Sequence, residues 1–268
     1  MKITLGFATR KRSSYMISSI MSWLTSALEK NRLEFIVALD DDDLDSIEKY
    51  KELEPLVKYY GADIKLLVEP TTGYKRLFER QNQMVKHMTG DCIIMLADDF
   101  FCETLEWDFL VEETLENVYE KDKDASVLLW MCGVNLEKTH PECVGLNKKW
   151  LEISKVFSPT NACDAYARDL ARAANLTVVR PPIIFYHLQR KLNRPNELKH
   201  DDGTEIFRKP PPYGGNEDLW LDYFGEQAKD SKWRETIKHE DKYYRYEEGE
   251  IGEQFKLIVQ EFKNYYGK

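Results

Sequence analysis

The chain has 268 residues, of which 43% are hydrophobic, and a formal net charge of −9 at neutral pH. This length suits one large α/β domain or two small ones, and the composition is that of a globular protein. The acidic balance argues against a broad basic surface for duplex nucleic acid. No apolar run approaches the roughly 20 residues that cross a bilayer, so we expect no integral membrane segment.

The five cysteines are odd in number and form no C-x-x-C pair. This usage argues for reduced thiols and against a zinc site. The N-terminus runs directly into a strand-like segment at Ile3, without the apolar stretch of a signal peptide. We therefore expect a cytoplasmic protein.

The first half of the chain alternates apolar strand-like runs with segments of helical periodicity. The expected strands cover residues 3–8, 35–39, 64–68, 92–97 and 127–132. The expected helices cover about residues 13–28, 44–60, 74–88 and 107–119. Ser13 or Ser14 is expected to cap the first helix and Asp43 the second. This alternation predicts a doubly wound, mostly parallel sheet flanked by helices.

The second half is less regular. Residues 162–174 have helical periodicity, residues 176–179 and 183–186 are strand-like, and residues 217–225 and 252–265 are again helical. Residues 188–212 are rich in charge and proline without periodicity, which predicts a long loop. The chain is thus expected to end in a loop and a helical extension.

The strand at 92–97 ends abruptly on two carboxylates, Asp98 and Asp99. A continuous apolar run is typical of a parallel strand buried on both faces, and ligands bind beyond the carboxyl ends of such strands. Adjacent carboxylates repel each other unless a cation neutralises them. A hard divalent ion such as Mg²⁺ or Mn²⁺ meets that need, and a solvated turn is the alternative.

The order of the short motifs resembles glycosyltransferases of the GT-A fold, closest to the inverting family 2 type. The matching residues are Thr9-Arg10, Asp40-Asp41, Arg80-x-Asn82, Gly90-Asp91, Ala97-Asp98-Asp99 and Glu106-Trp107-Asp108. The resemblance covers roughly residues 3 to 135 and predicts a GT-A-like mixed sheet. The chain departs from the family at Ala97, where the family's Asp-x-Asp metal motif has its first carboxylate.

The resemblance implies a metal-dependent enzyme that moves a sugar from a nucleotide sugar, a UDP-sugar, to an acceptor hydroxyl with inversion. Residues 1–135 would form the half that binds the nucleotide sugar. Residues 136–268 would form the acceptor side of the same compact domain, with the loop 188–212 as a lid and helices at the C-terminus. Its cofactor would be Mn²⁺ or Mg²⁺.

The resemblance also implies roles for single residues. Metal ligands would be Asp99 and His187, the latter standing just after the expected strand 183–186. Donor-binding residues would be Thr9, Arg10, Asp40, Asp41, Arg80 and Asp98, with Asp98 facing the ribose and Arg80 neutralising phosphate or pairing with Asp98. The catalytic base that deprotonates the acceptor would be Asp164, with Asp218 as its rival.

Two other functions remain open from the sequence. Ala97 in the metal motif favours a catalytically decayed sugar- or nucleotide-binding protein on the same scaffold. A nucleotidyltransferase is the other alternative, although the turn 9–12 lacks the glycines of its usual phosphate loop. The acceptor could be a glycan, a protein, a small molecule or a hydroxymethylated DNA base of the bacteriophage type.

Overall fold

The computed structural model describes residues 1–71, 76–131, 143–159, 163–187 and 249–267. In these ranges a central sheet of seven strands has the order β3-β2-β1-β4-β7-β6-β8. The strands are β1 (Ile3–Ala8), β2 (Leu33–Asp40), β3 (Asp63–Glu69), β4 (Cys92–Leu96), β6 (Val127–Met131), β7 (Cys143–Asn147) and β8 (Thr177–Val179). Strand β7 runs antiparallel to β4 and β6, and every other pair is parallel. The predicted mixed, mostly parallel sheet is confirmed.

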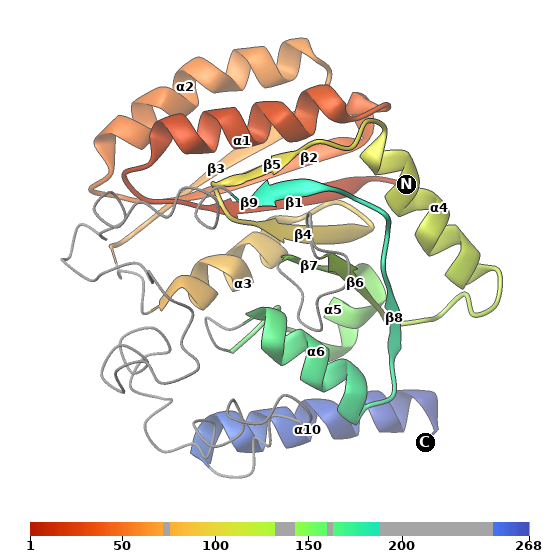
Figure 1. Cartoon of the computed structure of the whole chain (residues 1–268). Coiled ribbons are helices and arrows are strands. Elements are labelled where there is room, and N and C mark those ends of the chain that lie inside the picture. The colour runs from red at the N-terminus through yellow and green to blue at the C-terminus, as the bar shows by residue number, and fades with distance from the viewer. Residues whose placement is uncertain (72–75, 132–142, 160–162, 188–248, 268) are drawn as a thin grey trace.

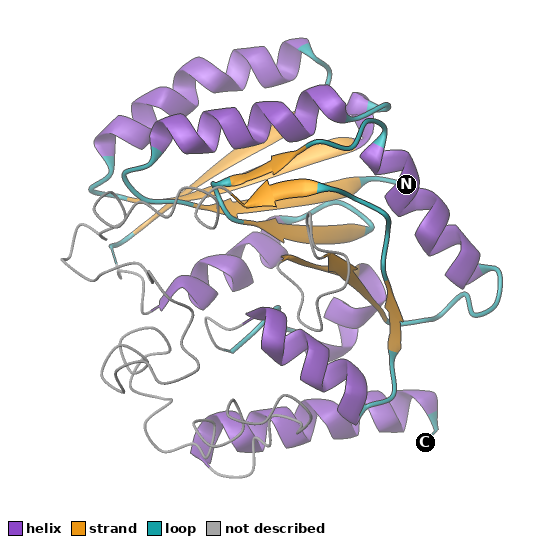
Figure 2. Ribbon diagram, viewed as in Figure 1, coloured by secondary structure: helices purple, strands orange, loops and turns teal. Residues whose placement is uncertain are grey.

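Helices cover both faces of this sheet (Figures 1 and 2). Those packed on the first face are α1 (Ser13–Ser26), α2 (Leu44–Tyr59) and α4 (Trp107–Tyr119). Those on the opposite face are α3 (Leu77–His87), α5 (Lys148–Ser154), α6 (Cys163–Ala173) and α10 (Gly249–Tyr266). A short 3₁₀ helix, Lys30–Arg32, leads into β2.

Two apolar cores follow from the alternation of side chains along the strands. In β1, Leu5 and Phe7 face α1 and α2, whereas Gly6 lies on the side of α3. A Cβ at Gly6 would stand 2.7 Å from the sulfur of Met95 and 3.2 Å from that of Met84. A side chain at this position would therefore require the flexible Met95 and Met84 side chains to shift.

The C-terminal helix α10 closes the second core. Phe262 packs edge-on against Trp150 of α5 at 5.3 Å, and Phe255 packs against Tyr166 of α6 at 5.8 Å between ring centroids. The apolar stripe of α10 thus packs on the domain. In the part of the chain that the structure describes, no helix combines the length and apolarity that a membrane crossing requires.

A second, two-stranded sheet stands beside the first. Strand β5 (Phe100–Cys102) pairs antiparallel with β9 (Phe185–His187), and Phe100 lies opposite His187. The sequence had placed His187 just after its strand, but it is the last residue of β9. This pairing brings His187 next to the turn that follows β4.

Other boundaries differ from the sequence predictions for local reasons. Strands β5 and β7 and helix α5 were not predicted, because each is seven residues or shorter and lacks a clear period. The predicted cap at Ser13 or Ser14 is wrong. Helix α1 begins at Ser13 after Arg12, and the Ser13 hydroxyl donates instead to Asp45 at 2.6 Å. Asp43 caps α2 as predicted, accepting from the backbone N–H of Ser46 at 3.3 Å.

Candidate functional site

The carboxyl ends of β1, β2 and β4 meet at one edge of the sheet, as parallel strands must. Polar residues from three loops gather there: residues 9–12 after β1, residues 40–43 around the end of β2, and Asp98 and Asp99 after β4. We call this set, together with His187 of β9 and Arg80 of α3, the aspartate edge.

Asp98 and Asp99 are the central residues of a tight turn. The backbone N–H of Phe100 donates to the carbonyl of Ala97 at 3.1 Å and closes this turn. The carbonyl of Phe100 accepts from the Ser19 hydroxyl at 2.5 Å and from the Trp23 indole N–H at 3.0 Å, both on α1. Helix α1 therefore fixes the turn and the two carboxylates in place.

Both carboxylates are buried, with Asp98 4% and Asp99 2% exposed. The Thr9 hydroxyl donates to Asp98 Oδ2 at 2.5 Å, and Arg12 Nη1 lies 2.9 Å from Asp98 Oδ1. Burial raises the pKa of Asp98 to about 6, with Arg12 opposing this rise and Asp99 adding to it. The guanidinium of Arg12 is thus the main positive charge that compensates the pair.

Asp99 is less well satisfied than Asp98. Among the described residues no group makes a hydrogen bond to its buried Oδ2. Arg12 Nη2 lies 3.3 Å and His187 Nε2 3.7 Å from this oxygen. The two predicted metal ligands, Asp99 and His187, are therefore brought together.

These two side chains do not by themselves make a metal site. Across the described ranges, no group of three or more His, Cys, Asp or Glu side chains gathers closely enough to hold a metal ion. An ion that binds a nucleotide commonly takes one or two protein ligands and completes its shell with phosphate oxygens and water. The unbonded Asp99 Oδ2 and the nearby imidazole fit a site of this kind.

Asp40, at the end of β2, is held between two arginines. Arg10 Nη1 donates to its Oδ2 at 2.8 Å, and Arg80 Nη2 donates to its Oδ1 at 2.7 Å. Arg80 also donates to the carbonyl of Pro70. The prediction that Arg80 pairs with Asp98 is therefore wrong, because α3 places it against β2 and Arg12 takes the partner role at Asp98.

Arg10 also forms a two-pronged ion pair with Asp42, with one prong at 2.7 Å. This pair, with a hydrogen bond from Thr71, lowers the pKa of the exposed Asp42 far below its ordinary value. Asp41 is exposed and accepts from the backbone N–H of Thr71 at 3.1 Å. The loops after β1, β2 and β3 are thereby tied together around two guanidinium groups.

Asp164 lies in the first turn of α6 and accepts from the backbone N–H of Ala165 at 2.7 Å. The preceding Cys163 accepts a hydrogen bond from Gln81 of α3 at 3.5 Å. Burial raises the pKa of the Cys143 thiol, and the charges at Cys163 and Asp164 add to this rise. Since Cys143 begins the antiparallel β7, Asp164 lies toward the same end of the sheet as the aspartate edge. The rival base Asp218, the helix 217–225 and the loop 188–212 fall outside the described residues.

Several residues of the matched motifs hold the fold. Asn82 ties α3 to the segment after α5, donating to the carbonyl of Ser158 at 2.7 Å and accepting from the N–H of Phe157 at 2.7 Å. Asp108 accepts from the backbone N–H groups of Leu28 and Glu29, both at 2.7 Å. None of these contacts faces the aspartate edge.

Arg12 was not predicted as a residue of the site. It belongs to the basic turn 9–12, but four polar residues in a row gave no means of choosing the one that faces Asp98 and Asp99. The choice depends on Lys11, whose positive φ of 51° turns the backbone just before α1. The Lys11 N–H donates to Asp43 at 2.6 Å and holds this bend.

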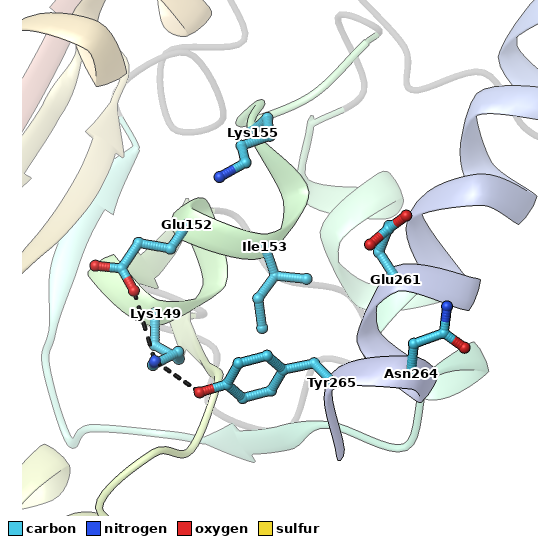
Figure 3. A pocket seen from close by; sticks show the side chains of 7 residues that line it. All are labelled: Lys149, Glu152, Ile153, Lys155, Glu261, Asn264 and Tyr265. Atoms are coloured by element: carbon cyan, nitrogen blue, oxygen red, sulfur yellow. Dashed lines mark hydrogen bonds and ion pairs between the residues drawn. The ribbon is translucent and has the colours of Figure 1, made fainter. Parts of the chain in front are cut away.

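A hollow of about 450 Å³ lies away from the aspartate edge, between α5 and α10 (Figure 3). Lys149 donates to the Tyr265 hydroxyl across it at 2.8 Å and lies 3.6 Å from Glu152. Because Lys149 joins α5 to α10 through Tyr265, we assign this hollow to the packing of α10.

No sequence-family profile matches the chain, and no curated protein matches its sequence. Solved structures do match its fold. A mannosyltransferase from Pyrobaculum calidifontis, PcManGT, in complex with GDP-Man and Mn²⁺, superposes with a TM-score of 0.53 at 12% sequence identity over 68% of this chain. The chain has a glycosyltransferase fold of the GT-A type. This agrees with the fold expected from the motif order.

The S. aureus TarS 1–349 structures with UDP and with UDP-GlcNAc also match. They are 16% and 15% identical over 69% of this chain, each with a TM-score of 0.49. The match corresponds to 56% of the mannosyltransferase and 60% of the UDP-bound TarS fragment, so this chain spans little more than half the length of the structures it resembles.

Proposed function

We propose that this GT-A-type chain is a glycosyltransferase that moves a sugar from a UDP-sugar to an acceptor hydroxyl with inversion, using Mn²⁺ or Mg²⁺. The observation that carries the proposal is the aspartate edge, where buried carboxylates and arginines gather at the carboxyl ends of β1, β2 and β4. This is where an open α/β sheet binds its ligand.

The donor diphosphate is the group that this edge suits best. Arg10 and Arg80 present two guanidinium groups at the ends of β1 and β2, and arginine forks pair with phosphate oxygens. Thr9 and the carboxylates of Asp40 and Asp41 would bind the base and the ribose. Asp98 would face the ribose from the turn after β4.

Asp99 and His187 are the residues that would hold the divalent ion. When bound, such an ion supplies Lewis-acid stabilisation of the charge that develops on the departing diphosphate. The protein side chains contribute two ligands and hold them rigidly, because β5 pairs with β9 and is fixed on α1.

The transfer itself needs a base on the acceptor side. Asp164 would take the proton from the acceptor hydroxyl, whose oxygen then attacks the anomeric carbon from the face opposite the leaving group. The bond from that carbon to the diphosphate oxygen breaks, and the diphosphate keeps the electron pair. Asp218 remains the rival for this role. A glycan, a protein, a small molecule and a modified DNA base remain open as acceptors.

Release of UDP from nucleotide sugars, with water as the acceptor, tests this proposal without knowledge of the natural acceptor. We expect one UDP-sugar to be hydrolysed in the presence of Mn²⁺ and the rate to fall strongly in Asp99→Asn. Asp63→Asn, an exposed carboxylate on β3 that pairs with Lys2, is the matched control and should be unaffected. Absence of UDP release and of nucleotide binding would contradict the proposal.

One observation favours a second function. Arg12 already compensates part of the negative charge of Asp98 and Asp99, which lessens the need for a metal ion at this pair. A sugar- or nucleotide-binding protein without catalysis would have this property. Such a protein would bind a nucleotide sugar with the same affinity in Mn²⁺ and in a chelator, and would not hydrolyse it.

A further inference from the structure

Arg12 occupies the side of the aspartate pair on which a cation is needed. Its guanidinium lies 2.9 Å from Asp98 and 3.3 Å from Asp99 and is about three-quarters buried. We propose that Arg12 competes with a divalent cation for Asp99, so that this arginine sets how tightly the site holds metal. The inference rests on the proposed function and concerns the same site.

The backbone of the loop 9–12 places Arg12 beside the two aspartates. Thr9 is bonded to Asp98, and Lys11 is bonded through its N–H to Asp43. Arg12 follows as the residue preceding the first turn of α1. Its position is thus fixed at the main chain, whereas the long side chain retains its rotatable bonds.

The same guanidinium also contacts an aromatic ring. The Arg12 guanidinium carbon stands 4.9 Å from the centre of the Tyr15 ring, one turn into α1. A cation above an aromatic face is stabilised there. In the position in which it pairs with the two aspartates, the Arg12 guanidinium is therefore also held by Tyr15, and an ion that displaces it must overcome both contacts.

Competition follows from the state of Asp99 Oδ2. This oxygen is buried and accepts no hydrogen bond from any described residue, and Arg12 Nη2 lies 3.3 Å and His187 Nε2 3.7 Å from it. A divalent ion held by Asp99 and His187 would stand within a few ångströms of the guanidinium, where two positive charges repel strongly. Binding of the ion must therefore displace Arg12 or tolerate this repulsion, and either cost weakens binding.

Replacement of Arg12 by an uncharged residue should strengthen the binding of a divalent ion. Without Arg12 the two buried carboxylates repel each other with no compensating charge, and a divalent ion then supplies the missing positive charge. The variant should therefore bind metal more tightly than the wild type, although it has lost a residue of the site.

The test measures Mn²⁺ binding to the full-length chain without any nucleotide, by the loss of the electron paramagnetic resonance signal of free Mn²⁺. We expect Arg12→Gln to lower the dissociation constant of Mn²⁺ at least about tenfold, which is the effect of one weakened ion-pair contact. Arg12→Lys keeps the charge but cannot bridge two carboxylates, so its affinity should fall in between. The matched control is Arg32→Gln, a half-exposed arginine that pairs with Glu112, and it should bind as the wild type does.

A double variant connects the effect to Asp99. Asp99→Asn in the Arg12→Gln background should abolish the gain in affinity. Equal or weaker Mn²⁺ binding by Arg12→Gln, or a gain that survives Asp99→Asn, would overturn the proposal. If Arg12→Gln does not fold without metal, competition predicts that millimolar Mn²⁺ restores its circular dichroism. Failure to recover would overturn the proposal as well.

Binding of UDP to the wild type separates this inference from the function on which it rests. If UDP binds but Arg12→Gln leaves Mn²⁺ affinity unchanged, the competition is wrong and the function stands. If no nucleotide binds while Arg12→Gln still gains Mn²⁺ affinity, the function is wrong and the competition stands.

Discussion

Buried carboxylates lie at both ends of the central sheet, but the two ends treat them in opposite ways. At the amino ends of the parallel strands, Glu34 of β2 is fully buried and surrounded by donors. At the carboxyl ends, Asp98 and Asp99 are almost as deeply buried but share a single arginine. We infer that Glu34 stabilises the fold, and we propose that Asp98 and Asp99 serve to bind a ligand.

Glu34 has a partner for each oxygen. Lys65 Nζ donates to Oε1 at 2.6 Å, while the Thr4 hydroxyl and the Thr89 N–H both donate to Oε2 at 2.7 Å. Burial by itself would raise the pKa of Glu34, but Lys65 and the threonines outweigh it, so that this pKa lies below its ordinary value. The ionised form is the stable one in the folded protein.

At Asp98 burial outweighs the favourable partners, so its pKa is raised, whereas the pKa of Glu34 is lowered. Burial raises the pKa of Asp98 to about 6, because Arg12 and Thr9 do not offset burial and the neighbouring Asp99. The fold therefore holds this pair at a cost. Perturbed pKa values of this kind cluster at sites where proteins bind ligands or carry out chemistry.

Asp99→Asn should give the largest effect on activity of all the changes at the two ends of the sheet. We expect UDP release from a nucleotide sugar to fall at least about 100-fold, because a ligand for the charge-stabilising ion is lost. The protein should remain folded, since the amide keeps the size of the carboxylate and relieves its repulsion of Asp98. The measurement is UDP release at saturating Mn²⁺.

Asp91→Asn is the control at the opposite end of the sheet. Asp91 accepts from the N–H of Lys2 at 2.8 Å and lies outside the aspartate edge. Its replacement should leave UDP release unchanged. Equal losses in the two variants would show that the position along the strands does not distinguish functional from structural carboxylates.

Glu34→Gln should give the opposite result. We expect it to lower the free energy of unfolding by about 2 kcal/mol, because Lys65 loses its buried partner while remaining able to reach water. Urea unfolding measures this loss. UDP release per folded molecule should stay at the wild-type level, and a strong loss of activity with unchanged stability would refute the structural role of Glu34.

Gly90→Ala tests the packing of the chain just before β4 against Lys2 and Thr4, next to Glu34. A Cβ at Gly90 would stand 2.5 Å from the Thr4 hydroxyl, 2.9 Å from the Thr4 backbone nitrogen and 3.0 Å from the Lys2 carbonyl oxygen. Because two of these atoms belong to the backbone, the strands must shift, and we expect a loss of about 1–2 kcal/mol in urea unfolding. A variant as stable as the wild type would show that β1 and β4 yield easily at this point.

The pH dependence of the free energy of unfolding should show the contribution of Glu34 as a smaller effect. Since the pKa of Glu34 is lowered on folding, its contribution is fully present above the ordinary glutamate value of 4.5 and is lost as the pH falls through the lowered pKa. The stability difference between wild type and Glu34→Gln should be constant from pH 7 to pH 5 and shrink below about pH 4.5. Urea unfolding at each pH measures it, and a difference that grows on acidification would contradict the account.

Much of the fold could be predicted from the sequence because its signals are local. The apolar runs 3–8 and 92–97 marked β1 and β4, and the helix at Trp107–Tyr119 matched its prediction. The position of Asp98 and Asp99 at the end of a buried strand followed from the same run. Strand β7 was missed because its five residues include Gly145 and show no alternation.

The partners in the site could not be predicted, because they depend on contacts between distant segments. Arg12 and Asp98 are far apart in the chain, and only the pairing of β1 with β4 brings them together. Of the two roles expected for Arg80, the pairing with Asp98 is wrong: Arg80 reaches Asp40 instead, since α3 packs beneath β2. The sequence identified the residue types of the site, whereas the topology decided which of them pair.

We propose that the aspartate edge binds a nucleotide sugar through a divalent ion. The most direct test is thermal unfolding of the wild type and Asp99→Asn with a panel of nucleoside diphosphates and nucleotide sugars, with and without Mn²⁺. A ligand that binds only the folded state raises the melting temperature according to its concentration relative to its dissociation constant. We expect a Mn²⁺-dependent rise with uridine nucleotides that Asp99→Asn abolishes. No rise with any nucleotide, with or without metal, would contradict the account.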